Sequence, residues 1–187
     1  TAHVYLGALS STWVRHVTAA AVFAALACTI SWPLPLHLAT HLPGLGIGDN
    51  VQFLWNFWWM REALSSGADF FHTPYLFAPF GTDLVLHSHT ALPALLGATV
   101  LGWLPLVTAH NLLLLASLFL NGFCAYLLAW KTTRDSGAAL LGGLLFGVSP
   151  YIAAHLHGHF NLTAAWTIPL FALAWQAAGL GVSDPAA

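Results

Sequence analysis

The feature that most constrains this chain is an uncharged, mostly apolar run at 110–130, HNLLLLASLFLNGFCAYLLAW. A helix needs about 20 mostly apolar residues to cross the hydrocarbon core of a bilayer, so this run predicts a membrane-spanning helix. Only 5% of the residues are charged, whereas about a quarter are charged in a soluble domain. The sequence therefore predicts an integral membrane protein. The net charge of −2 is too small to suggest nucleic acid as a partner.

Other apolar runs extend this prediction along the chain. With the 110–130 run, the candidate membrane helices are 16–36, 90–107, 138–154 and 162–180. The 90–107 run is broken by two prolines and two glycines, so we expect it to be re-entrant or to span only half of the membrane. The predicted fold is all-α: one polytopic membrane domain over 1–187, with four to five membrane helices. In the 138–154 run, Gly142, Gly143 and Gly147 would allow close helix packing.

Basic residues indicate the orientation of the chain. Lys131 and Arg134 hold half of the basic residues in one short loop, which the positive-inside rule places in the cytoplasm. Arg15, before the first apolar run, points the same way and puts the long loop at 37–87 outside. If the 90–107 run is re-entrant, that loop and the loop at 155–159 share the outer face.

The long loop opens with GDNVQFLWNFWWMREAL, for which we predict an interfacial amphipathic helix at about 50–65. Its apolar residues at helical spacing are Phe53, Phe57, Met60 and Leu64. Its tryptophans spread around the cylinder, which suits the headgroup region of a membrane. Asp49 or Asn50 is expected at the N-cap, where the side chain accepts a backbone hydrogen bond.

Asp49 has two interpretations. Capping alone explains an aspartate at the start of a helix. A carboxylate at a helix N-terminus near the membrane surface could also act as a base or hold a divalent cation, because the same N-terminus attracts anions such as lipid phosphates. The residue pattern leaves both open.

Histidines form the second candidate feature. His155, His157 and His159 alternate in HLHGHF, and an H-x-H pair can hold a transition metal. Asp49 or Asp83 would complete such a site if the loops meet. The alternative is that these are interfacial histidines bonded to water or backbone. His87 and His89 repeat the H-x-H spacing, and no spacing matches a known zinc enzyme.

Several segments together resemble a known family. The aspartate before an aromatic helix is followed by APFGTDL at 78–84, AHNLLLLASLFLNGFCAYLLA at 109–129 and LLFGVSPYIAAHLHGHFNL at 144–162. In this order they resemble the N-terminal part of bacterial polytopic glycosyltransferases of the GT-C superfamily, or a short relative of them. The likeness extends from about residue 12 to 180.

The resemblance implies a sugar transferase of the bacterial cytoplasmic membrane that uses a polyprenyl-phosphate donor at the extracytoplasmic face. It implies that Asp49 is the catalytic base toward an acceptor hydroxyl, with a divalent metal ion in some relatives. On this hypothesis the donor phosphate or metal contacts are His157 and His159, and the minor substrate contacts are Gln52 and Arg61. The candidate metal ligands are Asp49, His155, His157 and His159. Arg61, beside Glu62, also reads as a solvated interfacial residue.

A second hypothesis belongs to a different class. The chain would then be a non-catalytic membrane subunit that packs in a larger complex. Its Trp, Phe and His side chains would contact lipid, haem, pigment or other subunits. His16 and His110, at the ends of apolar runs, would be the axial ligands of a haem or chlorophyll. A transporter is a third hypothesis, against which stands the scarcity of charged pairs inside the predicted helices.

Overall fold

The computed structural model describes residues 2–44 and 49–179, with side chains from Thr12 onward. The chain is mostly helical, as predicted, with two short strands in addition. Three helical segments are long and apolar enough to cross a membrane: Thr12–Ile30, Leu106–Thr133 and Ser136–His155. These segments indicate a membrane protein. The four to five spans predicted from the sequence are not confirmed.

The chain divides into two compact units, one formed by Thr1–Trp32, Leu115–Ala154 and Ala164–Ala187 and the other by Pro33–Leu114 and His155–Thr163. We call them unit 1 and unit 2 and describe each by itself. The helix α4 (Leu106–Thr133) contributes residues to both. The single domain expected over 1–187 stays a prediction.

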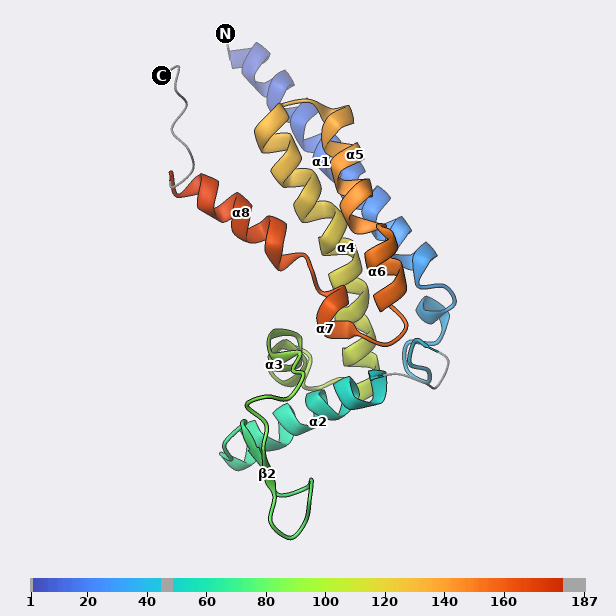
Figure 1. Cartoon of the computed structure of the whole chain (residues 1–187). Coiled ribbons are helices and arrows are strands. Elements are labelled where there is room, and N and C mark those ends of the chain that lie inside the picture. Colours follow the sequence, from blue (N-terminus) through green and yellow to red (C-terminus); the bar gives the residue numbers. More distant parts are fainter. Residues whose placement is uncertain (1, 45–48, 180–187) are drawn as a thin grey trace. The chain divides into compact units, whose positions relative to one another are not determined.

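Unit 1 is built from α1 (Ala2–Ile30), most of α4, α5 (Ser136–Gly147), most of α6 (Pro150–His155) and α8 (Thr167–Ala177) (Figure 1). The core of unit 1 lies where Phe23 of α1 packs with Tyr126 of α4 and Ala139 of α5.

Glycines bring α4 and α5 together in unit 1. A Cβ atom at Gly147 would lie 2.6 Å from the Cα atom of Gly122, and one at Gly143 would lie 2.7 Å from the carbonyl oxygen of Gly122. Real side chains do not approach a backbone this closely. The expected role of Gly143 and Gly147 in close packing is therefore confirmed by the geometry.

Unit 2 contains η1 (Leu34–Leu36), α2 (Asn50–Ser66), α3 (Ala91–Thr99), the first residues of α4 and the short α7 (Phe160–Thr163). Between α2 and α3, strands β1 (His72–Thr73) and β2 (Thr82–Asp83) pair antiparallel, with His72 opposite Asp83. The imidazole of His72 lies 2.9 Å from the Asp83 carboxylate, on an exposed surface. Asp83 is thus engaged within this hairpin.

Several helix boundaries differ from the predicted ones. The first helix ends at Ile30 instead of continuing to residue 36, because Pro33 and Pro35 lack the N–H groups that an α-helix needs. The 90–107 run contains the nine-residue α3, which is too short to cross a membrane, and the first two residues of α4. The 162–180 run is divided into α7 and the eleven-residue α8.

The helix predicted at 50–65 is present as α2, but it is buried on more than its apolar stripe. Phe53, Phe57 and Met60 are buried as expected, whereas Leu64 is 53% exposed. Trp59 is also buried, and its indole N–H donates to the carbonyl oxygen of Phe70 at 2.9 Å. α2 is therefore a packed helix within unit 2, and its predicted place at a membrane surface stays a prediction.

Candidate functional site

The start of α2 is fastened to two loops that are distant in sequence. The backbone N–H of Asp49 donates to the carbonyl oxygen of Gly158 at 3.2 Å. The side-chain amide of Asn50 donates to the carbonyl oxygen of His157 at 3.1 Å and also to that of Pro43. Asn50 is only 6% exposed, so these bonds lie in a water-poor place. The structure thus brings Asp49 beside the loop that carries His155, His157 and His159.

Asp49 occupies the N-cap position of α2, but its carboxylate does not cap. The backbone oxygen of Asp49 accepts from the N–H of Phe53 at 2.8 Å, as the first bond of the helix. The side chain accepts no capping hydrogen bond, so the expected capping bond is absent. The carboxylate is exposed and forms no hydrogen bond or ion pair with the residues of 2–44 and 49–179. Capping therefore does not account for this aspartate.

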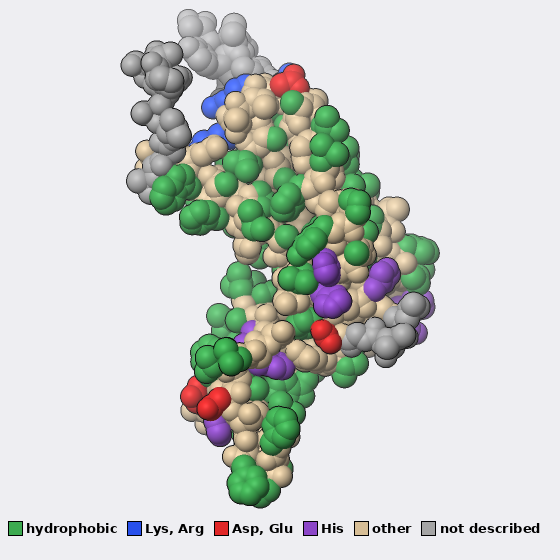
Figure 2. Space-filling view, in the orientation of Figure 1, with side chains coloured by type: hydrophobic (Ala, Val, Ile, Leu, Met, Phe, Trp, Pro, Cys, Tyr) green, Lys and Arg blue, Asp and Glu red, His purple; other side chains and the backbone are tan. Residues whose placement is uncertain are grey.

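The three histidines lie on a turn between two helices. α6 ends at His155, and the backbone N–H groups of Gly158 and His159 both donate to the carbonyl oxygen of His155. The rings of His155 and His159 meet edge to face, 5.1 Å between centroids. His157 and His159 are exposed, whereas His155 is half-buried. Figure 2 shows histidine side chains gathered near an acidic side chain on this surface.

The structure gives no support to a preformed metal site. Among the side chains that the structure describes, no group of three or more His, Cys, Asp or Glu residues is placed to hold one ion. The proposed ligand set of Asp49, His155, His157 and His159 is therefore not assembled in this geometry. The divalent metal ion stays a prediction, and no chemical step below depends on it.

Gln52 lies near Asp49, and Arg61 does not. Gln52 is three residues further along α2, and residues at this spacing are neighbours on a helix surface. Arg61 lies about 18 Å further along the axis than Asp49, at 1.5 Å per residue. Of the two predicted minor contacts, only Gln52 is placed beside the aspartate.

Arg61 has a structural partner of its own. Its guanidinium donates to the carbonyl oxygens of Gly97 (2.9 and 3.2 Å), Leu101 (3.2 Å) and Leu104 (3.0 Å) at the end of α3. Burial lowers the pKa of Arg61. The interpretation of Arg61 as a solvated residue is corrected by these bonds. Most of its donors are used by backbone carbonyls, and its predicted role as a minor substrate contact stays a prediction.

Buried asparagines were missed by the sequence analysis. In α2, the amide of Asn56 donates to the carbonyl oxygen of Ser88 at 2.9 Å, and its oxygen lies 2.8 Å from the imidazole of His87. In α4, the amide of Asn111 donates to the carbonyl oxygens of Leu38 (2.9 Å) and His41 (2.7 Å). An asparagine in an apolar helix is a signal for such bonds, because buried polar groups are almost always paired.

Among the described residues, His87 and His89 also belong to no metal-binding group. Besides the bond of His87 to Asn56, the imidazole of His89 lies 2.7 Å from the carbonyl oxygen of Leu84. Burial lowers the pKa of His87, and the nearby His89 lowers it further. Both rings are thus held by neighbouring protein groups.

The two histidines considered as haem or chlorophyll ligands are both packed against aromatic rings. In unit 1, the imidazole of His16 lies 2.9 Å from the Tyr126 hydroxyl, and its ring meets that of Trp130 edge to face. In unit 2, the ring of His110 lies between Phe57 and Phe160, with centroids 5.2 and 5.1 Å away. A pigment ligand stays a prediction for both.

Comparisons with known proteins add no relative. No family model, no curated protein and no solved structure matches this chain.

Proposed function

We propose that this chain is a membrane glycosyltransferase, or the N-terminal portion of one, that uses a polyprenyl-phosphate sugar donor. The reaction would take place at the extracytoplasmic face of a bacterial cytoplasmic membrane, with Asp49 as the catalytic base. The observation that carries the proposal is the state of Asp49. Its carboxylate is exposed and makes no cap, while its backbone is fixed to the histidine loop through Gly158.

The proposed chemistry is an inverting transfer. The Asp49 carboxylate takes the proton of an acceptor hydroxyl, whose oxygen attacks the anomeric carbon of the donor sugar. As this bond forms, the bond between that carbon and the donor phosphate oxygen breaks. The phosphate leaves with the electron pair and stays attached to its lipid.

The leaving phosphate needs positive charge or hydrogen-bond donors nearby. The first N–H groups of an α-helix have no partner within the helix, and the positive end of the helix dipole lies at the same end, which for α2 is beside Asp49. The exposed imidazoles of His157 and His159 are carried by the loop that is bonded to this N-terminus. Gln52, on the first turn of α2, would contact a sugar or acceptor hydroxyl.

The test is Asp49→Asn in the full-length protein, with sugar transfer from a polyprenyl-phosphate donor as the measurement. Loss of a general base is expected to lower turnover by about 10²- to 10⁴-fold. The matched control is Glu62→Gln, which removes one carboxylate from the same helix and should leave turnover unchanged. If Asp49→Asn turns over like the unmodified protein, Asp49 is not the base.

A second candidate function is supported by the exposed apolar surface of unit 1. On α5, Leu141 and Leu145 are 56% and 68% exposed, and Trp13 of α1 is 70% exposed. Such side chains need lipid or neighbouring helices to cover them. A non-catalytic subunit of a larger membrane complex would use them in this way, and it would tolerate Asp49→Asn with no loss of the activity of that complex.

A further inference from the structure

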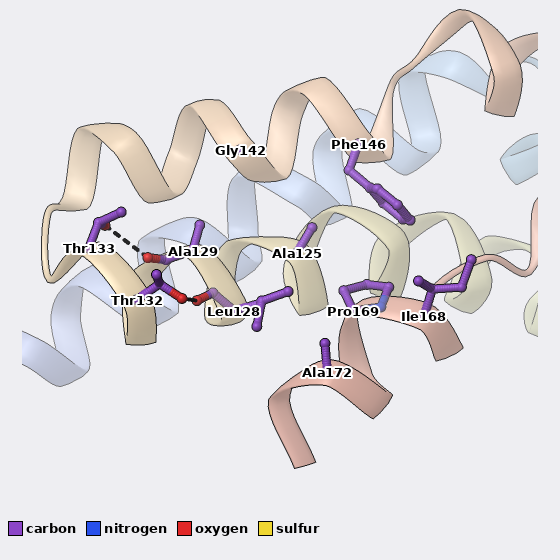
Figure 3. Close-up of a pocket in the computed structure, with 10 residues that line it drawn as sticks. All are labelled: Ala125, Leu128, Ala129, Thr132, Thr133, Gly142, Phe146, Ile168, Pro169 and Ala172. Atoms are coloured by element: carbon purple, nitrogen blue, oxygen red, sulfur yellow. Dashed lines mark hydrogen bonds between the residues drawn. The ribbon is translucent and has the colours of Figure 1, made fainter. Parts of the chain in front are cut away.

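An apolar groove runs along unit 1 between α4, α5 and α8 (Figure 3). Its volume is about 390 Å³, which lies within the usual range of ligand pockets. Along α4 it extends from Ala125 to Thr133, or about 12 Å at 1.5 Å per residue. Phe146 of α5 and Ile168 of α8 border the same space.

The wall of the groove offers almost nothing to a polar ligand. The Thr132 hydroxyl donates to the carbonyl oxygen of Leu128 at 2.9 Å, and the Thr133 hydroxyl donates to that of Ala129 at 2.8 Å. Both hydroxyl protons are thus used within α4. The remaining lining side chains are apolar, and several are small: Ala125, Leu128, Ala129, Gly142, Phe146, Ile168, Pro169 and Ala172. Hydrocarbon is the chemistry that fits.

Positive charge collects where the groove ends. Lys131 lies in the last turn of α4, and Arg134 follows the helix directly. Within the described part of the chain, their side chains form no hydrogen bond or ion pair. The neighbouring acid in the chain, Asp135, uses its carboxylate to cap α5 through the N–H of Ala138. Figure 2 shows the Lys and Arg side chains at this end of unit 1.

Arg15 of α1 adds a third cation to this end of unit 1. Its guanidinium donates to the Ser136 hydroxyl at 3.5 Å and lies 6.0 Å from the centre of the Trp130 ring. Arg15 is thus already engaged by neutral groups, whereas Lys131 and Arg134 have no partner among the residues that the structure describes.

We propose that this groove binds an anionic phospholipid, with an acyl chain against α4, α5 and α8 and the phosphate at Lys131 and Arg134. A further protein helix in the groove would leave both cations without an anion unless it carried acidic residues. An anionic lipid supplies an apolar chain for the groove and a negative charge for the two cations. Long basic side chains reach a headgroup while their stems lie on apolar surface. The topology predicted from these residues places them at the cytoplasmic leaflet, which carries the anionic lipids.

The experiment is native mass spectrometry of the full-length protein in detergent, with phosphatidylglycerol and phosphatidylcholine supplied in equal amounts. The unmodified protein is expected to retain phosphatidylglycerol preferentially. Since each cation near a membrane surface contributes about fivefold, Lys131→Gln with Arg134→Gln should reduce that preference by about 25-fold. Both side chains are free of protein partners among the described residues, so this variant is expected to fold.

A second pair of variants tests the groove. Ala172→Phe places a ring in it and should lower the retention of both lipids. The matched control is Ala174→Phe on the same helix, at an exposed position outside the groove. An unchanged lipid preference in the Lys131 and Arg134 double variant would overturn the headgroup site. Equal lipid retention by Ala172→Phe and Ala174→Phe would overturn the acyl-chain site, as expected if another protein segment covers the groove.

Discussion

Replacing Asn50 tests how the site is held together. Its buried amide donates to the carbonyl oxygens of Pro43 and His157, so Asn50→Ala removes both hydrogen bonds. A hydrogen bond contributes a net ~0.5–1.5 kcal/mol, and the loss of both should therefore destabilise this place by about 1–3 kcal/mol. Asn50→Asp keeps the shape but sets a carboxylate against two carbonyl oxygens, and should cost at least as much.

The assay is amide hydrogen exchange. The N–H of Asp49 is protected by its bond to the carbonyl oxygen of Gly158. The bond from Asn50 to His157 joins α2 to the same loop, so we expect the two bonds to open together. A loss of about 1–3 kcal/mol should speed exchange at Asp49 and through 155–163 by about 5- to 160-fold, while α5 keeps its protection. Asn161→Ala is the matched control, because this side chain is exposed and makes no such bond within the described part of the chain. Unchanged exchange at Asp49 in both Asn50 variants would refute the idea that this amide holds the site.

Two further substitutions, one in each unit, test the packing. Arg61→Lys keeps the charge but loses the fork that bonds three carbonyls, so we expect the protein to lose about 1–3 kcal/mol and the amides of α3 to exchange faster. Equal thermal stability of Arg61→Lys and the Glu62→Gln control would contradict this role. In unit 1, Gly147→Ala forces a Cβ against the backbone of Gly122 and should cost about 1–3 kcal/mol relative to Gly137→Ala, since both changes gain similar helix propensity. Thermal unfolding in detergent measures the difference, and equal midpoints would show that α5 shifts without cost.

The long apolar helices were predictable because their signal is local. The 110–130 and 138–154 runs contain no charge, and the structure places α4 and the α5–α6 segment over them with somewhat longer ends. The shorter elements were less predictable. In the 90–107 run, the interruptions indicated an incomplete span. The last turn of α3, however, is held by a bond from Arg61 to the carbonyl oxygen of Gly97, 36 residues away in the chain.

The amphipathic interpretation of α2 failed in part for a related reason. A period of 3.6 residues identifies one buried face, and Phe53 and Phe57 lie on it. Asn56 and Trp59 are buried as well, and they bond to Ser88 and Phe70, which lie outside α2. The spacing of apolar residues within α2 does not indicate such contacts. A helix packed on several sides has no single apolar stripe, so the prediction of a surface helix underestimated its burial.

The candidate site shows which part of such a geometry a sequence can indicate. Asp49 and the histidines drew attention because their chemistry is rare in an apolar chain, and the structure joins their two segments. The group that joins them, Asn50, has no reactive chemistry and stands next to a more conspicuous residue. Its importance follows from burial, because an amide without water must find acceptors, and both acceptors here are backbone carbonyls that carry no sequence signal. The residues that hold a site in place are therefore harder to predict than the residues that would react in it, and Asn50 is the position where the two can be tested separately.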